Sequence, residues 1–410
     1  MNSIRVNFIW TLLGQLMEKG APFFVSVLLV RDFNAKDYTE YALLAISVIS
    51  LAALSSTGIQ IAATKFARHS KDGDQQAAAI LSQLQRFAII QSFAFIVIAL
   101  FSASLWYPQA QILDSFVLII ASLGISLSAI PNAKLVAMRK FKDLSLISIC
   151  GGMIVLGGTI LSVAFQSIAA AKLSLAISAV VTMISAWVLS KRSFIDSSLE
   201  KNLFRRVKLS TALRETTPLA ASAAITALTN LAFARLFLSG SNGSPESFAA
   251  FSIGMQWFSL AQFIPSIVNR VTFPDILSSG KLKQNDSRTS SEPYKQAMKF
   301  SVIAALITSV LIGLFSAPLA GLYGATYITP FTIIVFASIS AVSAPINIYG
   351  NVLIAESKQW HWFINTLLWA LILLTTAYFS SALGVFGAAI ALWISSIVQL
   401  FIARLLIRTY

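Results

Sequence analysis

Long apolar runs, separated by short polar segments, recur from one end of the chain to the other. Each run is close to or longer than the roughly 20 residues that an α-helix needs to span the hydrocarbon core of a bilayer. The pattern therefore predicts an all-α polytopic membrane protein with about 12 transmembrane helices. The predicted helices cover residues 6–30, 38–64, 77–106, 112–133, 144–165, 171–190, 215–238, 246–275, 298–320, 328–355, 362–380 and 384–407.

Composition agrees with this class. Hydrophobic residues make up 57% of the chain and charged residues only 11%, against roughly 25% charged residues in an ordinary soluble domain. The first apolar run contains Glu18 and Lys19, and no small-x-small cleavage site follows it. We therefore expect a permanent first helix rather than a signal peptide.

Lysine and arginine are distributed unequally between alternate loops. If the N-terminus is cytoplasmic, the outer loops hold only Arg31, Lys36 and Lys172, and most other basic residues fall in inner segments. Because cytoplasmic loops are enriched in basic residues, we predict that both termini and the segment 191–214 are cytoplasmic. These loops also account for nearly all of the net charge of +14, so no nucleic-acid partner is expected.

The spacing of the runs suggests a duplication, with six helices, a basic segment and six more helices. We predict an N-terminal lobe at 1–190, a cytoplasmic linker at 191–214 and a C-terminal lobe at 215–410. The similar stretches LVAMRKFK and LIAESKQW end the fourth and the tenth predicted helices. Since each lobe would begin on the cytoplasmic side, the two would be related by a pseudo-two-fold axis along the membrane normal.

Polar residues at steps of three and four form stripes along three of the predicted helices, which places them on one face of each helix. Small polar residues also join helices in a packed bundle, but intramembrane ionisable residues mark transport pathways, so we favour a shared aqueous cavity. The stripes are Asn7, Thr11, Gly14, Gln15, Glu18, Lys19, Pro22 and Ser26 in the first helix; Ser50, Thr57, Gln60 and Thr64 in the second; and Ser252, Gln256, Ser259, Gln262, Ser266, Asn269 and Arg270 in the eighth.

Glu18 and Lys19 lie near the middle of the first predicted helix, where a charged side chain costs several kcal/mol in hydrocarbon. We hypothesise that Lys19 gives the cavity positive potential and that Glu18 balances it by pairing with Lys19 or another base. The alternative is a structural ion pair without a role in transport. The candidate substrate-binding residues are Gln15, Glu18, Lys19, Arg86, Arg235, Gln256, Gln262 and Arg270.

The three arginines in this set have an alternative interpretation, because each lies near the end of a predicted helix. A long arginine side chain can snorkel to the membrane interface from such a position. For Arg235 we favour snorkelling over a role in function.

No enzyme chemistry stands out. The chain has no P-loop, GxSxG motif, convergent carboxylate pair or metal-ligand spacing, and we do not expect an enzyme. Cys150 is the only cysteine, and the two histidines, His69 and His361, are placed in predicted loops. We therefore expect no metal site and no cofactor.

Four stretches resemble signatures of the polysaccharide transporter family, the Wzx-type O-antigen flippases of the superfamily that also holds multidrug extruders. Their order and spacing along the chain carry the resemblance more than any one of them does. One departure is NLAFAR (230–235), where related sequences often carry an acid in the seventh helix; it argues against cation coupling through that helix. The four stretches are DFNAKDYTEYALLAIS (32–47), IPSIVNRVTFPDIL (264–277), LIAESKQWHWFINTLL (353–368) and GVFGAAIALWISSIVQLFI (384–402).

The resemblance implies two six-helix lobes around a central cavity that opens alternately to the two sides of a bacterial inner membrane. The implied substrate is an undecaprenyl-pyrophosphate-linked oligosaccharide, carried from the cytoplasmic to the periplasmic leaflet. We hypothesise that Arg86 and Arg270 attract its pyrophosphate toward the cavity from the cytoplasmic side. Besides this substrate, the expected partners are the lipid bilayer and other polysaccharide assembly proteins. The alternatives are a cation-coupled multidrug exporter of the same fold, a membrane glycosyl polymerase and a structural scaffold.

Overall fold

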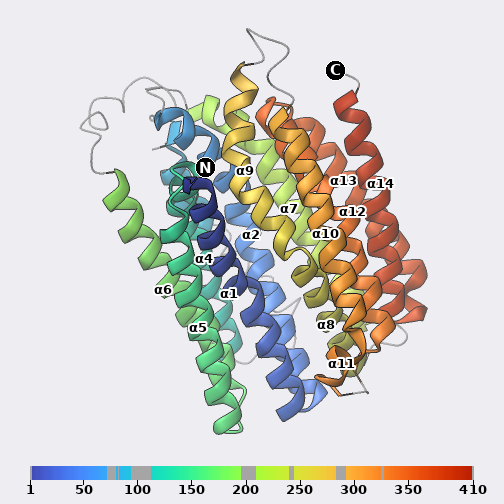
Figure 1. The fold of residues 1–410 in the computed structure, drawn as a ribbon. Coiled ribbons are helices and arrows are strands. Elements are labelled where there is room, and N and C mark those ends of the chain that lie inside the picture. The colour runs from blue at the N-terminus through green and yellow to red at the C-terminus, as the bar shows by residue number, and fades with distance from the viewer. Residues whose placement is uncertain are drawn as a thin grey trace.

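The computed structural model describes residues 2–71, 80–81, 83–93, 112–194, 209–239, 244–282, 292–324 and 327–408. These residues form long helices and the turns between them, with no strand in the described ranges (Figure 1). The helices are α1 (Asn2–Asp32), α2 (Ala35–Lys71), α4 (Ile112–Ala137), α5 (Phe141–Ala164), α6 (Ala169–Phe194), α7 (Leu209–Ser239), α8 (Pro245–Ala261), α9 (Phe263–Leu282), α10 (Glu292–Leu314), α11 (Ser316–Gly321), α12 (Pro330–Ala355), α13 (Gln359–Ser380), η2 (Ser381–Leu383) and α14 (Val385–Arg408).

The prediction of an all-α polytopic membrane protein is confirmed. Ten helices in the described part of the chain are long and apolar enough to cross a membrane. The predicted span 77–106 lies largely outside the described residues. The ends of the predicted linker, 191–194 and 209–214, belong to α6 and α7, while 195–208 is not described.

Two predicted spans are interrupted, and prolines explain both breaks. The span 246–275 is divided at Gln262 into α8 and α9, because Pro265 has no N–H to donate to the carbonyl of Ala261. The span 298–320 ends as a regular helix at Leu314 and continues as the short α11, where Pro318 leaves the carbonyl of Leu314 without its usual partner.

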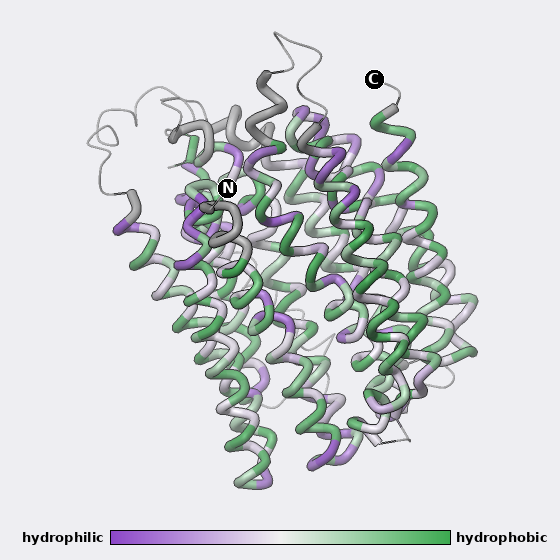
Figure 2. Tube along the Cα trace, in the orientation of Figure 1, coloured by the Kyte–Doolittle hydropathy of each residue, from purple (hydrophilic) through white to green (hydrophobic). Residues whose placement is uncertain are grey.

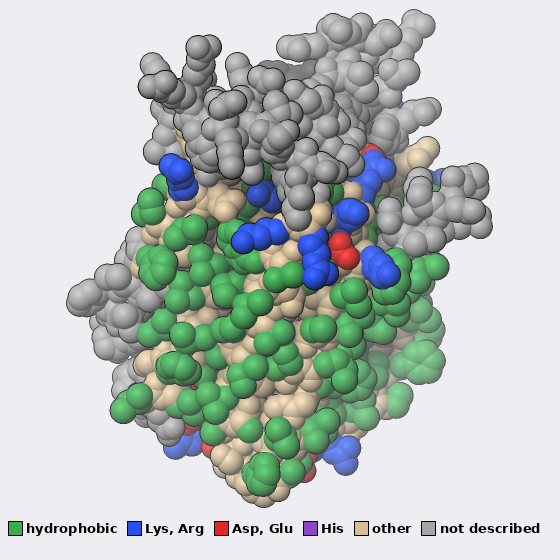
Figure 3. Space-filling view, turned by 90° about the vertical axis from the view of Figure 1, so that its left-hand side faces the viewer, with side chains coloured by type: hydrophobic (Ala, Val, Ile, Leu, Met, Phe, Trp, Pro, Cys, Tyr) green, Lys and Arg blue, Asp and Glu red, His purple; other side chains and the backbone are tan. Residues whose placement is uncertain are grey.

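The two ends of the helix bundle differ in charge. We call the end that carries the α4–α5 turn, the α12–α13 turn and both chain termini the basic end, and the other the opposite end (Figure 1). Hydrophobic residues dominate the helices between the ends (Figure 2). In the face shown in Figure 3, hydrophobic side chains cover this middle band, and most of the visible lysines and arginines gather near the basic end.

The described helices pack in two groups. In the N-terminal group (α1, α2, α4, α5 and α6), α1 packs on α5, α2 on α4, and α6 on α4 and α5. In the C-terminal group (α7 to α14), α12 packs on α8, α10 and α14, and α13 packs on α7 and α14. The predicted lobe boundaries and the pseudo-two-fold axis remain predictions.

The groups meet mainly where α2 packs on α7 and α8, and where α1 packs on α8 and α9. The α2–α7 contact is close because Gly58 has no side chain. A Cβ at Gly58 would lie only 2.3 Å from the backbone nitrogen of Ala220, so any other residue there would force the two helices apart.

At the opposite end the groups share one large apolar core. It joins α1 and α2 to α7, α8, α12 and α14. At its centre the ring of Phe23 lies 4.9 Å from that of Trp257 and 6.1 Å from that of Tyr323, both edge to face. Hydrogen bonds add to it, since Ser26 lies 3.2 Å from the Tyr323 hydroxyl. We call Phe23, Trp257 and Tyr323 the aromatic seal.

Lys172 was counted with the outer loops in the charge distribution, although it stands at the edge of the predicted helix 171–190. It lies in the first turn of α6 with its side chain only 2% exposed. Its Nζ is 2.9 Å from Asp114 Oδ1 on α4 and 3.3 Å from Glu40 Oε2 on α2. A buried charge needs such partners, so this ion triad joins three helices of the N-terminal group.

Candidate functional site

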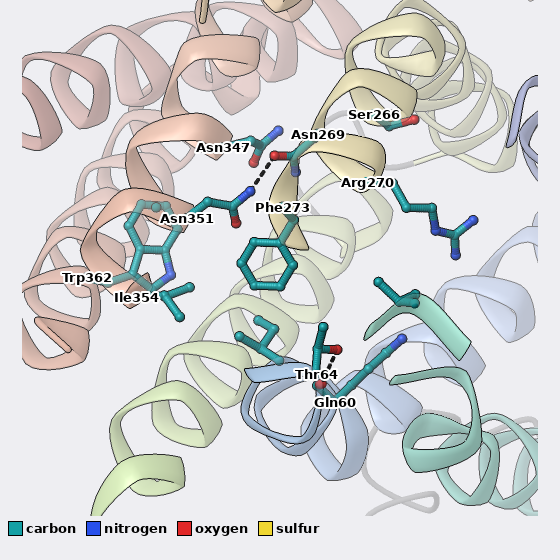
Figure 4. Close-up of a pocket in the computed structure, with 13 residues that line it drawn as sticks. Gln60, Thr64, Ser266, Asn269, Arg270, Phe273, Asn347, Asn351, Ile354 and Trp362 are labelled. Atoms are coloured by element: carbon teal, nitrogen blue, oxygen red, sulfur yellow. Dashed lines mark hydrogen bonds between the residues drawn. The ribbon is translucent and has the colours of Figure 1, made fainter. Parts of the chain in front are cut away.

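A cavity of about 320 Å³ lies between the two helix groups, next to the basic end (Figure 4). Its position follows from Val136 and Ile354, which come from the last turns of α4 and α12, and from Trp362 in the first turn of α13. The lining residues are Gln60, Ile61, Thr64, Val136, Ser266, Asn269, Arg270, Phe273, Asn347, Gly350, Asn351, Ile354 and Trp362.

Two of the polar stripes read from the sequence meet at this cavity. Gln60 and Thr64 come from α2 and are spaced by four residues, while Ser266, Asn269 and Arg270 come from α9 at steps of three and four. Residues at these spacings share one helix face. Because the face of α2 and the face of α9 belong to different groups, the cavity lies on the boundary between them.

The sequence reasoning missed the contribution of α12 and α13. Asn347 and Asn351 are spaced by four residues on α12, and Asn351 donates a hydrogen bond to Asn269 Oδ1 across to α9. Two asparagines at this spacing in an apolar helix were a signal that could have identified this face. Trp362 from α13 packs against Gly350, where a Cβ would come 2.9 Å from the indole ring.

Arg270 links the cavity to the stripe on α1. Its Nη1 lies 3.4 Å from Glu18 Oε2, and the same oxygen accepts a 2.7 Å hydrogen bond from Gln15 Nε2. Ser266 Oγ lies 3.0 Å from Gln15 Oε1 and completes a network between α1 and α9. Glu18 therefore pairs with a base from the other group and not with its neighbour Lys19.

The ion pair is partly exposed, with 26% of the Arg270 side chain and 41% of the Glu18 side chain accessible. It can therefore exchange partners at modest cost, because a partly hydrated ion pair contributes little net stability. Arg270 is the only charged side chain among the described residues that line the cavity. Its neutralisation by Glu18 leaves the cavity nearly neutral in this state.

The structure does not bring the other predicted site residues into the cavity. Lys19 is half-buried on α1, and its ammonium forms no hydrogen bond or ion pair within the described part of the chain. Gln256 donates to the Tyr38 hydroxyl (3.3 Å) near the opposite end, and Gln262 donates to the carbonyl of Ser340 (3.2 Å) at the break between α8 and α9. Both glutamines thus join helices.

Arg86 and Arg235 also lie apart from the cavity lining. Arg86 is exposed in the helical segment 83–93. Arg235 is half-buried near the end of α7, between Phe233 and Phe237 along the chain, and those two rings belong to the core at the opposite end. Neither position contradicts an interfacial role for these arginines.

The histidines are in helices and not in loops, since His69 belongs to the last turn of α2 and His361 to the first turn of α13. No group of three or more histidine, cysteine, aspartate or glutamate side chains in the described ranges could hold a metal ion. The cavity instead offers amides, hydroxyls, aromatic rings and one guanidinium, which suit a polar or anionic organic ligand.

A family model described as "Polysaccharide biosynthesis protein" matches residues 4–279. The chain belongs to this family. The matched region includes nearly all of α1, all of α2 and the cavity face of α9. No curated protein matches the chain.

Solved structures of transporters share the fold. An inward-facing multidrug resistance MATE family transporter of the MOP superfamily is 14% identical, with a TM-score of 0.70 over 98% of this chain and 97% of the other. The outward-facing form gives 16% identity and a TM-score of 0.69, over 99% and 95%. A MOP superfamily transporter from Pyrococcus furiosus, described as having a binding pocket of reverse polarity that suggests a different function, gives 15% identity and 0.72, over 99% and 96%.

The predicted family resemblance is thus confirmed by the family match. At these identities the solved structures establish the fold of the chain. Family and fold together support a membrane transporter.

Proposed function

We propose that the chain is a flippase that moves an undecaprenyl-pyrophosphate-linked oligosaccharide from the cytoplasmic to the periplasmic leaflet of a bacterial inner membrane by alternating access. The observation that carries the proposal is the composition of the cavity. It combines the guanidinium of Arg270 with four amide side chains and two aromatic rings, and none of its described lining residues is acidic.

The chemistry of such a substrate fits these groups. A pyrophosphate and a glycan cannot cross hydrocarbon without partners for their charges and hydroxyls. Arginine forms strong charge-assisted hydrogen bonds with phosphate oxygens, and amides both donate to and accept from hydroxyls. The polyprenyl tail would remain in the lipid while the head group occupies the cavity.

The main alternative, an exporter of cationic drugs, needs the opposite charge. A carboxylate facing the cavity would stabilise a cation, but the nearby Glu18 is paired with Arg270. Pocket polarity varies within this fold, as the description of the Pyrococcus furiosus transporter states for that protein. The charge of the lining is therefore the feature that separates the two functions. A glycosyl polymerase has no observation in its favour.

Orientation completes the proposal. With both termini cytoplasmic, the basic end and the cavity beside it face the cytoplasm, where the lipid-linked glycan is assembled. In a Cys150→Ala background, a membrane-impermeant thiol reagent should label Ser197→Cys only from the cytoplasmic side and Asn242→Cys only from the periplasmic side. Labelling of Ser197→Cys from outside would contradict this orientation.

Arg270 provides the test of function. In cells that lack the chain, wild type should restore surface glycan, and Arg270→Ala should lower it about tenfold or more while lipid-linked glycan accumulates inside, because a charge-assisted hydrogen bond is worth roughly 1.5–3 kcal/mol. Arg270→Lys keeps the charge and should retain part of the activity. Arg235→Ala, outside the cavity, should have a milder effect.

Equal amounts of inserted protein must be verified for each variant. Wild-type transport by Arg270→Ala would show that the guanidinium does not contact the substrate. Cationic drug efflux by the wild type, with no effect on glycan, would favour the exporter.

A further inference from the structure

The cavity is divided into two chemically different sides (Figure 4). Arg270 lies on one side, near Gln60 of α2, whereas Asn269, Asn347 and Asn351 gather with Trp362 on the other, and the ring of Phe273 lies between. The second side contains no charged residue among those that the structure describes. A ligand that spans the cavity would therefore meet a cation at one end and a neutral polar surface at the other.

The asparagine side has unused hydrogen-bonding capacity. An amide side chain carries two N–H donors and an oxygen with two lone pairs. In the described part of the chain, the bond from Asn351 to Asn269 Oδ1 is the only side-chain hydrogen bond made by these three amides. Asn347 is exposed in the cavity wall. The wall thus presents several donors and acceptors close to the ring of Trp362.

This combination is suited to a sugar ring. A pyranose has hydroxyls around its rim, each of which donates and accepts, and patches of C–H groups on its faces that pack on an aromatic surface. A phosphate would find no cation there, and a hydrocarbon chain would leave the amides without partners, which costs free energy. The cavity volume of about 320 Å³ is at the lower end of the range for small-molecule sites, about 300–1,000 Å³, which favours one terminal part of a glycan over a long oligosaccharide.

We infer that Asn269, Asn347, Asn351 and Trp362 form a sugar-binding subsite that recognises the glycan residue nearest the pyrophosphate, while Arg270 binds the pyrophosphate itself. This inference rests on the proposed function and adds the source of its specificity. Gly350 contributes by leaving room for the indole of Trp362 against α12. A larger residue at position 350 would displace the ring.

The test compares two ligands on the purified full-length protein in nanodiscs: undecaprenyl pyrophosphate without sugar, and the lipid-linked glycan extracted from cells that lack this chain. Wild type should bind the glycan lipid more tightly. Asn351→Leu removes hydrogen bonds worth about 1 kcal/mol and should weaken binding of the glycan lipid about fivefold, and Trp362→Ala, which removes the aromatic surface under the sugar ring, should weaken it by a similar factor. Both variants should change binding of undecaprenyl pyrophosphate less than twofold. Arg270→Gln should weaken binding of both lipids to the same extent.

Trp360→Ala is the matched control, because Trp360 lies two residues from Trp362 on α13, is 54% exposed and does not line the cavity. It should leave both affinities unchanged. If Asn351→Leu or Trp362→Ala fails to fold, the smaller changes Asn351→Ala and Trp362→Phe replace them. These should also weaken binding of the glycan lipid selectively.

The possible failures are distinguishable. If the subsite variants weaken binding of both lipids equally, or of neither, the proposal of a sugar subsite is wrong while the flippase proposal stands. If wild type binds neither lipid, both proposals fall.

Discussion

At the opposite end of the bundle the two helix groups meet through a large core with buried aromatic rings, whereas at the basic end exposed charged and polar side chains add to a smaller apolar cluster that includes Leu219 of α7 and Ile354 of α12. Trp257 of the aromatic seal is 1% exposed. At the basic end, Arg139 in the α4–α5 turn forms an ion pair with Asp275 of α9, and these side chains are 39% and 46% exposed. Lys65 donates to Ser357 in the α12–α13 turn (3.0 Å).

The difference indicates which end opens more easily. Burial of aromatic surface is strong and insensitive to salt, while exposed ion pairs contribute about 0–1 kcal/mol and are screened by ions. The cavity adjoins the weaker end. The structure therefore represents a state in which the larger buried core closes the opposite end, while the cavity adjoins the end with the smaller core and the exposed polar contacts.

Among the variants that test the difference between the two ends, Trp257→Ala should have the largest effect. Truncation of a buried tryptophan costs roughly 3–5 kcal/mol, and here it removes the ring contacts with Phe23 of α1 and with Tyr323. We expect a clear fall in thermal stability and faster reaction of an impermeant thiol reagent with Ser252→Cys, which is buried near the seal, in a Cys150→Ala background. Trp360→Ala serves again as the exposed control. Unchanged labelling in Trp257→Ala would show that the aromatic rings do not close this end.

The contacts between the two helix groups differ in how far they can be predicted from the sequence. Local periodicity predicted the helices and placed Gln60, Thr64 and Arg270 on cavity-facing stripes, because the helix repeat fixes which residues share a face. Pro265 carried a local signal for the break in the eighth span that the length of the apolar run obscured.

Pairings between distant residues could not be predicted in this way. Glu18 and Arg270 are 252 residues apart, and the sequence left open whether Lys19 or another base is the partner of Glu18. Lys172 was counted with the outer loops because it lies at the start of a predicted helix. Its partners, Asp114 and Glu40, belong to other helices and could not be identified from the local pattern. Which base meets which acid depends on how the helices cross, and periodicity contains no information on that.

Glu18→Gln should have an intermediate effect, and the direction in which it changes the affinity for pyrophosphate tests the role of Glu18. The change releases Arg270 from a partly exposed pair worth up to about 1 kcal/mol, so stability should fall little and affinity for inorganic pyrophosphate should rise, by up to about fivefold, in a calorimetric titration. Lys19→Gln removes a positive charge from the next position and should not increase this affinity. The double variant Glu18→Gln, Arg270→Gln should lose pyrophosphate binding. Weaker binding by Glu18→Gln alone would show that Glu18 helps to hold the anion.

Asp275→Asn should have the smallest effect. Its labelling rate and that of Trp257→Ala should respond differently to salt, because different interactions hold the two ends. Loss of an exposed pair worth about 0.2–1 kcal/mol should raise the rate at which an impermeant thiol reagent labels Asn347→Cys in the cavity, again without Cys150, by no more than about fivefold. In about 1 M sodium chloride the Debye length falls to roughly 3 Å, so the wild-type ion pair is screened. Asn347→Cys should then be labelled at the same rate with Asp275 and with Asp275→Asn. The faster labelling of Ser252→Cys in Trp257→Ala should persist at the same salt concentration, because apolar packing is not screened. If salt abolished both differences, charge and not aromatic packing would hold the opposite end closed.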